Sequence, residues 1–360
     1  MFTAWRELRF ARGRFALMGT VIVLITLLVV LLSGLTAGLG RQNVSAITGL
    51  PADRIAFAAP AGDRSPSFAD SSVTEAQWRR WATTPGVTNA EPLGITTTKA
   101  TSGDRSTGVS VFGVRAGSPL APHGDRLTAD SAVLSGAAAG ELGAKPGDQV
   151  VVGGRRMTVA EVSGEASFSH TPVIWTTLDV WRATAPPTGA GPAATVIALS
   201  TTPGTDLFAT DAAVGTRTVT VDESLRAIGS YSSENGSLQL MRGFLFAISA
   251  LVIGAFFTVW TIQRSGDLAV LKALGATTAG LLADALGQAV VLLAAGTLTG
   301  TALAAGVGAL LAGSAVPFVL TPATVLVPAV VMVVLGTLGA ALAIRRVTSV
   351  DPLTALGSSR

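Results

Sequence analysis

Long stretches without a charged side chain alternate with one long polar segment in this chain. Residues 15–40 carry no charge and include LMGTVIVLITLLVVLLSGL, and residues 243–263 are also uncharged. A third uncharged stretch, residues 285–344, is too long for one membrane helix, which needs about 20 apolar residues. The segment VPFVLTP divides this stretch, because Pro317 and Pro322 favour a turn. The pattern therefore predicts four membrane-spanning helices.

The fold class that follows is an α-helical membrane protein with four transmembrane helices. A large extracytoplasmic α+β domain, residues 39–240, is inserted between the first and second of them. We place the spans at residues 15–38, 241–263, 277–314 and 322–345. A cleaved signal peptide is a second interpretation of the first span. Its apolar core is longer than the usual signal sequence, and no convincing A-x-A cleavage site follows.

Arginine and lysine near the span ends predict the orientation, because cytoplasmic loops carry an excess of these residues. They precede the first span, lie between the second and third, and follow the fourth, but are missing from the turn between the third and fourth. We therefore expect a multi-pass protein of the cell membrane with both termini in the cytoplasm. Residues 1–14 are expected to form a cytoplasmic amphipathic helix and residues 346–360 a cytoplasmic tail. The basic residues are Arg6, Arg9, Arg12, Arg14, Arg264, Lys272, Arg345, Arg346 and Arg360.

The outer segment carries several short patterns typical of strands. Two of them flank Gly153 and Gly154, which predicts a hairpin over residues 148–162. Helices are expected at residues 74–84, with Thr74 as the N-cap, and at residues 130–143. Residues 183–193 (ATAPPTGAGPA) are expected to form a loop. The other expected strands are residues 108–114, 171–178, 194–200 and 217–221.

The composition supports a membrane protein and gives no sign of catalysis. Only 13% of the 360 residues are charged, about half the share in a soluble domain. Each of the three lysines is followed by alanine or proline, so none heads the G-x-x-x-x-G-K-[ST] loop of an ATPase. The chain has no cysteine, and His123 and His170 have no carboxylate spacing typical of a metal site. We expect no enzyme activity, no intrinsic cofactor or metal, and no nucleic-acid partner.

A short charged segment, QRSGDLAVLKALGAT at residues 263–277, interrupts the apolar pattern between the second and third spans. Its leucines recur every third residue and its charged residues lie mostly elsewhere, as in a short amphipathic helix. Gly275 suits the position after the helix end, and Thr277 or Thr278 suits the N-cap of the third span. From the pattern alone, a helix lying on the lipid headgroups and a helix that binds another protein both stay open.

This segment resembles the cytoplasmic loop of FtsX/MacB-type (type VII) ABC transporter permeases, in which an arginine, an acidic residue and L-x-x-L-[KR]-A-[LI]-G-A recur. Three further stretches are similar to the same family. AWRELRFARGRFAL resembles its helix ahead of the first span. AVLSGAAAGELGAKPGDQVVVGGRRMTVAEVS, residues 132–163, resembles its extracytoplasmic strand pair. RRVTSVDPLTAL resembles its basic end after the last span.

The resemblance implies a homodimeric permease in the lipid membrane, driven by a separate cytoplasmic ABC ATPase that binds the ATP. Residues 264–276 would be its coupling helix, with leucines in a groove of the ATPase and basic residues against an acidic rim. ATP-driven closure of the ATPase would move the second span and the outer domain by mechanotransmission. The expected coupling residues are Arg264, Asp267, Leu268, Leu271, Lys272 and Leu274. Gly296 and Gly300 suit close helix packing, either within one protomer or between two.

A lone permease of this length looks most like the haem-efflux group of the family (the HrtB group), whose ATPase is HrtA-like. Haem would then be a transported ligand held near the outer leaflet. The segment SYSSENGSLQLMRG offers Tyr231 and Met241 as haem ligand types, together with Glu234. Arg242 would pair with a propionate. The alternative for this segment is an ordinary interfacial tyrosine and basic anchor. Alternatives for the protein are an FtsX-like signal transmitter and a MacB/DevC-like exporter of antibiotics or peptides.

Overall fold

The computed structural model describes residues 12–184, 193–263, 277–311 and 316–348, together with Gly266, Val270, Leu274 and Gly275. The chain divides into two compact units. One unit contains residues up to Gly38 and from Ser237 onward, and the other is the continuous segment Leu39–Gly236.

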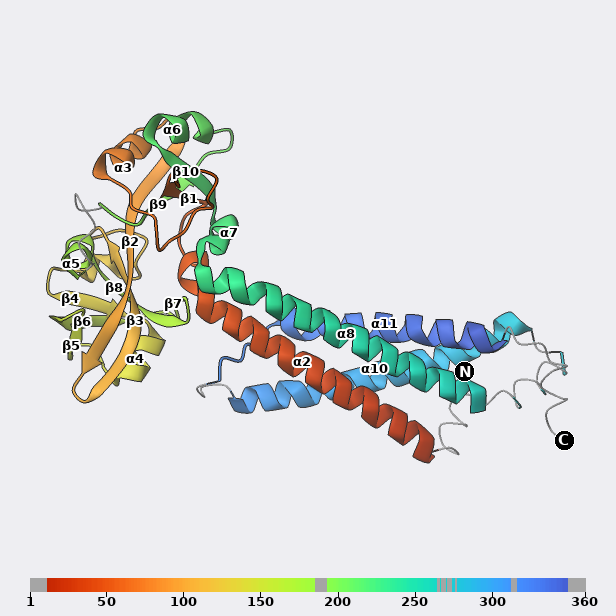
Figure 1. The fold of residues 1–360 in the computed structure, drawn as a ribbon. Helices are drawn as coiled ribbons and strands as arrows, with labels where there is room; N and C mark the ends of the chain where they lie inside the picture. Colours follow the sequence, from red (N-terminus) through yellow and green to blue (C-terminus); the bar gives the residue numbers. More distant parts are fainter. Residues whose placement is uncertain are drawn as a thin grey trace. The chain divides into compact units, whose positions relative to one another are not determined.

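Four long helices make up the first unit and lie side by side as a bundle (Figure 1). Each is long and apolar enough to cross a membrane. The helices are α2 (Arg12–Thr48), α8 (Gly229–Gln263), α10 (Thr278–Leu311) and α11 (Pro322–Thr348). The chain is thus a helical membrane protein with a large inserted α+β unit between its first and second membrane helices.

Two of these helices continue well past the apolar stretches. Helix α2 runs on from residue 38 to Thr48, and α8 begins at Gly229 rather than at residue 241. Hydropathy marks only the part of a helix that needs an apolar environment, whereas polar turns stay helical when their side chains have partners. The polar ends of α2 and α8 therefore belong to the second unit.

Glycines allow α2 and α10 to pack closely. A Cβ atom at Gly300 would lie 2.6 Å from the Val23 carbonyl oxygen, and one at Gly296 would lie 2.7 Å from the Ile22 side chain. The pair Gly296 and Gly300 therefore packs within the protomer, against α2. Small residues are the usual means of close helix packing in lipid, where apolar side chains gain little by leaving the lipid tails.

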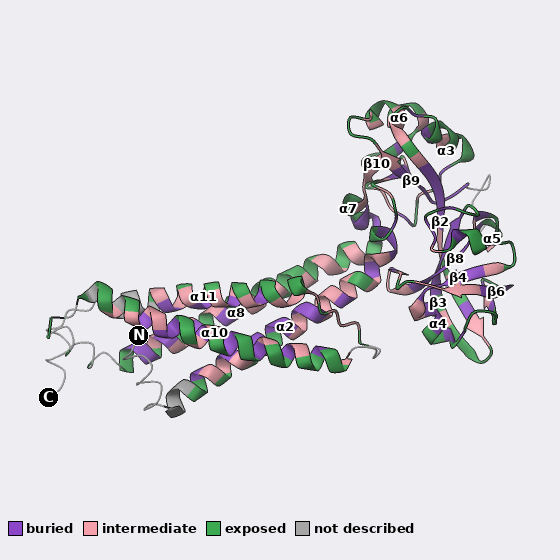
Figure 2. Cartoon of the chain, turned by 180° about the vertical axis from the view of Figure 1, so that it is seen from behind, coloured by how far each residue is buried: buried purple, intermediate pink, exposed green. Residues whose placement is uncertain are grey.

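The connection between α10 and α11 is held in a similar way. The Phe318 ring fills the space that side chains at Gly34 of α2 and Gly308 of α10 would occupy. The Val319 amide donates to the Gly34 carbonyl at 3.1 Å. Thr321 then caps α11, since its hydroxyl accepts from the Thr324 amide at 3.2 Å. The four helices also share a buried apolar core, which includes Ile22, Phe257, Leu293 and Met332, and Figure 2 shows buried positions alternating with exposed ones along the helices.

The described part of the second unit contains ten strands, and one long strand, β2 (Val87–Ser102), belongs to both of its sheets. The first half of β2 belongs to an antiparallel sheet in the order β10-β1-β9-β2. Helices α3 and α6 accompany this sheet (Figure 1). The bounds are β1 (Arg54–Ala58), β9 (Val196–Thr201), β10 (Thr216–Thr220), α3 (Glu75–Ala82) and α6 (Leu207–Val214).

The second half of β2 belongs to a mixed sheet that closes on itself. From β2 the order is β3-β8-β4-β6-β5, and β5 pairs back onto β2 at Ala100 and Thr101. The pairs β3–β8 and β4–β6 are parallel and the rest are antiparallel. The bounds are β3 (Arg105–Val114), β4 (Ser131–Leu134), β5 (Gln149–Val152), β6 (Arg155–Val162) and β8 (Thr171–Thr177), with β7 (Ser167–Phe168) beside β8 and helices α4 (Gly136–Leu142) and α5 (Leu178–Thr184).

Aromatic side chains fix the interior of this unit. Phe57, Phe68, Phe168 and Phe112 form a chain of edge-to-face contacts with ring centroids 4.8 to 5.7 Å apart, the arrangement that aromatic rings prefer. Trp181 of α5 lies flat on β2 and β3 at two glycines, Gly94 and Gly113, where any Cβ would come within 2.3 Å of it.

Several sequence expectations for this unit are confirmed. Thr74 caps α3, with the reciprocal hydrogen bonds of a capping box to Gln77. Strands β5 and β6 form the hairpin, and Gly153 and Gly154 both have the positive φ that its two-residue turn needs. The four other expected strands coincide with β3, β8, β9 and β10. Residues 185–192 of the expected loop lie outside the described residues.

Two expectations for the outer unit need correction. Residues 130–143 are not one helix, because they contain strand β4 followed by α4, which starts after the N-cap Ser135. The alanines favoured a helix, but the pairing of β4 with β6 and β8 prevails. Strand β2 was not expected, since Pro92, Gly94 and a run of threonines hide its alternation.

The packing of α10 on α2 can be tested with two alanine substitutions. Gly300→Ala should lower the free energy of unfolding by about 1–3 kcal/mol, the usual cost of overpacking, because its Cβ would meet the Val23 carbonyl. Gly306→Ala is the matched control in the same helix, since its Cβ would meet open space. Thermal unfolding of the detergent-solubilised protein measures both. Equal midpoints for the two variants would contradict the close contact.

Candidate functional site

A cluster of polar side chains lies where the outer ends of α2 and α8 meet strands β7 and β8. Asn43 comes from α2, Ser230 and Glu234 from the first turns of α8, and Ser169 and His170 from the turn between β7 and β8. All five residues belong to the outer unit. We call this cluster the junction.

An imidazole and a carboxylate are in direct contact at the junction. The His170 Nε2 atom lies 2.7 Å from Glu234 Oε2, and both side chains are half-exposed. The Asn43 amide nitrogen lies 3.4 Å from the same carboxylate oxygen and 3.1 Å from the His170 ring nitrogen. When Nε2 carries a proton, it donates to Glu234. A half-exposed carboxylate held by two donors keeps free lone pairs for a cation or a hydrogen-bond donor.

Asn43 is the residue that joins the three segments. It is 1% exposed, and its Oδ1 accepts a hydrogen bond from the Ser230 hydroxyl at 2.8 Å. The Ser230 hydroxyl also lies 2.8 Å from that of Ser169. The backbone adds two bonds, since the amides of Ser169 and His170 donate to the carbonyls of Asn43 and Gln42 at 2.9 and 3.2 Å. The amide of Asn43 therefore bonds to the strand turn and to α8 at once.

The turn that carries His170 has an unusual backbone. Ser169 and His170 have φ values of 50° and 63°, in the left-handed region that residues other than glycine rarely adopt. Such conformations cost about 1–3 kcal/mol and persist where the surroundings hold them. The hydrogen bonds to α2 and α8 hold this turn, which directs the imidazole at Glu234.

Tyr231 lies one residue after Ser230 on α8. Its side chain is half-buried and packs against the aromatic core of the outer unit. It is the only tyrosine of the chain. Of the expected haem residues, Tyr231 and Glu234 therefore lie at or beside the junction.

Met241 and Arg242 lie further along α8 and outside the junction. Met241 is 56% exposed. The Arg242 Nε atom is buried and has no hydrogen-bond partner in the described part of the chain. Seven residues of α-helix turn through nearly two full rotations and rise about 10 Å, so Glu234 and Met241 occupy the same side of α8. The four expected haem residues thus share one side of a single helix.

Most of the expected coupling residues, namely Arg264, Asp267, Leu268, Leu271 and Lys272, lie outside the described residues. Leu274 is described and is 80% exposed. Its amide donates to the Val270 carbonyl at 3.0 Å, which is a helical turn. Gly275 has a φ of 95°, as suits a residue that ends a helix. Thr277 is the N-cap of α10, because its hydroxyl accepts from the Gly280 amide.

The sequence pattern indicates no role for His170 or for Asn43. The two residues are 127 positions apart, and no local pattern relates them. The only signal in the sequence was the polar stretch SFSHTP before a strand, which indicates a turn but not its neighbours. No group of three or more metal-binding side chains occurs among the described residues.

Family models match both units of the chain. A model described as the MacB-like periplasmic core domain matches residues 15–217. A model described as the FtsX-like permease C-terminal matches residues 240–352. The chain therefore belongs to the FtsX/MacB family of ABC transporter permeases.

Full-length relatives carry more particular names. A hemin transport system permease protein HrtB of Staphylococcus haemolyticus is 27% identical, over 99% of this chain and 99% of the relative. A protein of the same name from Staphylococcus epidermidis is 24% identical over the whole of both chains. An uncharacterized ABC transporter permease of Mycobacterium bovis is 26% identical over 99% of each.

Among solved structures, the periplasmic region of MacB from Actinobacillus actinomycetemcomitans covers 51% of this chain and 95% of its own length. It is 11% identical, with a TM-score of 0.37. The extracellular domain of the ABC-type transporter YknZ from Gram-positive bacteria covers 47% of this chain and 99% of its own length, at 14% identity and a TM-score of 0.35.

The role of Asn43 at the junction can be tested by stability. Asn43→Ala should lower the free energy of unfolding of the outer unit by about 1–3 kcal/mol, because it removes the acceptor of Ser230 and a donor to Glu234. Gln42→Ala is the matched control, with an amide of similar chemistry one residue away. Hydrogen exchange of the Ser169 and His170 amides reports the turn directly. Equal exchange in the two variants would contradict the role of Asn43.

Proposed function

We propose that this permease is the membrane subunit of an efflux pump that removes haem from the membrane. It works as a homodimer with a separate cytoplasmic ATPase, and both of its termini lie in the cytoplasm. One observation carries the proposal: the chain aligns from end to end with hemin transport permeases. The lack of a Walker A lysine supports an ATPase on another chain.

The proposed haem site lies along α8, near the junction. Tyrosinate, methionine and histidine are all known haem ligand types. Tyr231 and His170 lie at or beside the junction, whereas Met241 is ten residues and about 15 Å further along α8 and does not bind the same iron together with Tyr231. Arg242 pairs with a propionate, which gives its buried and unpartnered Nε atom a role. Glu234 holds His170 through the 2.7 Å contact and orients its ring. Haem is the cargo here, so the site has to bind it reversibly.

In the proposed mechanism, the ATPase exerts its force on the cytoplasmic end of α8. Residues 264–276 form a coupling helix whose leucines dock on the ATPase, with Arg264, Asp267 and Lys272 at the polar edge of the contact. Helix α8 is unbroken from Gly229 to Gln263, and an unbroken helix transmits a displacement along its length. ATP-driven movement at Gln263 therefore reaches Tyr231 and Glu234, and haem is released outward by mechanotransmission.

Haem binding is the direct test of the cargo. Titration of haem into the purified full-length protein should give a saturable change of the Soret band. Tyr231→Phe should change the band position if the phenolate is a ligand. Glu234→Ala should weaken binding about 10- to 100-fold, the usual effect of losing a ligand or its supporting partner. Ser232→Ala, an exposed position on the same helix, is the control.

The outcomes test two claims independently: that haem is the cargo, and that its binding site lies on α8. Absence of a saturable change with the wild-type protein would overturn haem as cargo. Wild-type affinity in both Tyr231→Phe and Glu234→Ala would keep haem and overturn the site on α8. The variant His170→Ala shows whether the imidazole is a ligand, because loss of a ligand changes the band shape as well as the affinity.

Coupling to the ATPase can be tested with one substitution that introduces a charge into the coupling helix. Leu271→Asp should abolish the stimulation of ATP hydrolysis by the permease, since it places a carboxylate in an apolar contact. Ala269→Asp is the matched control, about 200° away on the helical wheel. The ATPase rate of the reconstituted complex is the readout. Unchanged stimulation with Leu271→Asp, or equal loss in both variants, would overturn the docking of the leucine side.

A further inference from the structure

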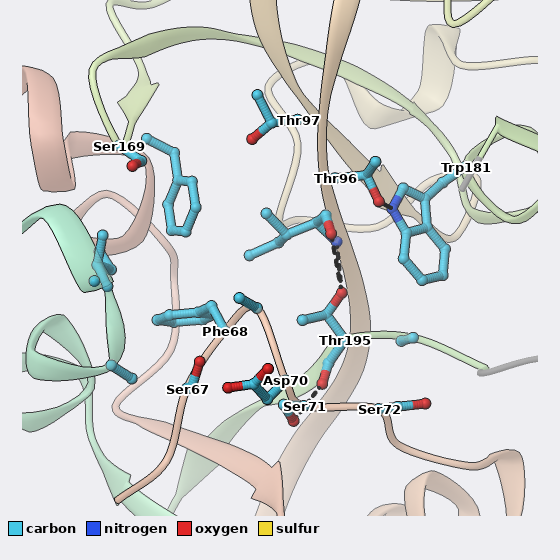
Figure 3. A pocket seen from close by; sticks show the side chains of 17 residues that line it. Ser67, Phe68, Asp70, Ser71, Ser72, Thr96, Thr97, Ser169, Trp181 and Thr195 are labelled. Atoms are coloured by element: carbon cyan, nitrogen blue, oxygen red, sulfur yellow. Dashed lines mark hydrogen bonds between the residues drawn. The ribbon is translucent and has the colours of Figure 1, made fainter. Parts of the chain in front are cut away.

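A pocket of about 670 Å³ lies within the outer unit, between the two sheets that share β2. Its size falls in the usual range for ligand sites. Apolar side chains of Phe68, Phe168 and Ile228 line one part of it. In Figure 3, Thr97 and Asp70 lie on opposite sides of the pocket, with Phe68 between them.

The polar part of the lining consists almost entirely of hydroxyl groups. Among the described residues that line the pocket, Asp70 is the one with a charged side chain. Its carboxylate has no hydrogen bond or ion pair with any other described residue, and its side chain is exposed. The described lining contains no lysine, arginine or histidine. The pocket therefore has a negative electrostatic character.

Strand β2 has an incomplete edge at this pocket. Its pairing with β9 ends at Leu93, and its pairing with β5 begins at Ala100. A side chain completes the first open position, since the Thr195 hydroxyl accepts from the Ile95 amide at 2.8 Å and donates to its carbonyl at 3.3 Å. The Thr195 side chain thus makes the two hydrogen bonds to the Ile95 main chain that a neighbouring strand would otherwise make.

Thr97 is the next residue that points the same way. Backbone groups of an extended strand alternate in direction, so the amide and carbonyl of Thr97 point to the same side as those of Ile95. Thr97 is exposed, lines the pocket, and its main-chain groups have no partner on that side among the described residues. An open strand edge of this kind is a template for pairing with another chain.

We propose that this pocket binds an extended peptide, one residue of which pairs with the main chain of Thr97. The peptide places an apolar side chain against Phe68, Phe168 and Ile228, and a lysine or amino-terminal ammonium group near Asp70. Main-chain hydrogen bonds to a sheet edge with pockets for alternate side chains are a recurring mode of peptide recognition. The unpaired stretch of β2 is short, so a single residue of the peptide makes the paired bonds.

The negative charge of the pocket favours a peptide with a cationic group over haem as the ligand. Haem carries two propionates, and Asp70 disfavours them. The peptide pocket and the haem site on α8 are therefore different sites, although the pocket lining includes Ser169 of the junction and Gly229, which precedes Ser230 of the junction. This inference does not rest on the proposed cargo.

The test uses the full-length protein in lipid nanodiscs and a pool of fluorescein-labelled pentapeptides. Each peptide contains one lysine and alternating leucine or valine, and binding is measured by fluorescence anisotropy. Thr97→Pro removes the amide donor and should weaken binding about fivefold to tenfold. Thr97→Ala keeps the main chain and should bind within about twofold of wild type. Asp70→Asn should weaken binding of lysine peptides but not of their lysine-acetylated forms.

Two further measurements make the result decisive. Peptides methylated on the central amide nitrogen cannot donate to the Thr97 carbonyl and should lose affinity even with wild-type protein, which removes any dependence on how Thr97→Pro folds. Haem should not displace the bound peptide. No saturable binding by any peptide of the pool would overturn the proposal, as would equal affinity for methylated and unmethylated peptides, or displacement by haem.

Discussion

The fold depends on backbone hydrogen bonds that have no water to replace them inside a lipid bilayer. Each membrane-spanning segment of this chain is therefore a helix, in which every amide finds its carbonyl within the segment. Helices α2 and α8 keep this geometry beyond their apolar parts, to Thr48 and from Gly229. The polar ends of both helices belong to the outer unit.

The junction joins these polar ends to the strands within the outer unit. Asn43 is buried and bonds to Ser230 of α8 and to the turn of Ser169 and His170, so the two helix ends and the strand turn share one set of hydrogen bonds. A buried side-chain amide without hydrogen-bond partners costs about 1–3 kcal/mol of stability. This cost opposes any movement that would break the hydrogen bonds of Asn43. The same contacts fix His170 against Glu234 and bring the strand turn beside the peptide pocket. The peptide pocket is thus next to the residues of the outer unit that join the polar ends of α2 and α8 to its strands.

A local feature is predictable from the sequence where one short segment contains its whole physical cause. The capping box of Thr74 and Gln77 and the turn of Gly153 and Gly154 are of this kind. Elements are not predictable in this way where distant partners override local preference. Residues 131–134 pair with β6 and β8 despite their helix-forming neighbours. The threonine-rich β2 is a strand because three other strands, β3, β5 and β9, bond to its edges along its length.

The sequence by itself determined the four apolar helices, the inserted outer domain, the lack of a Walker A lysine and the family. These follow from hydropathy, residue order and short motifs, which need no knowledge of neighbours in space. Only the tertiary structure decided that His170 meets Glu234, that Gly300 packs on Val23, and that the main chain of Thr97 has one side without a partner among the described residues. Each of these depends on which distant segments the closed fold brings together, and a one-dimensional pattern does not contain that information.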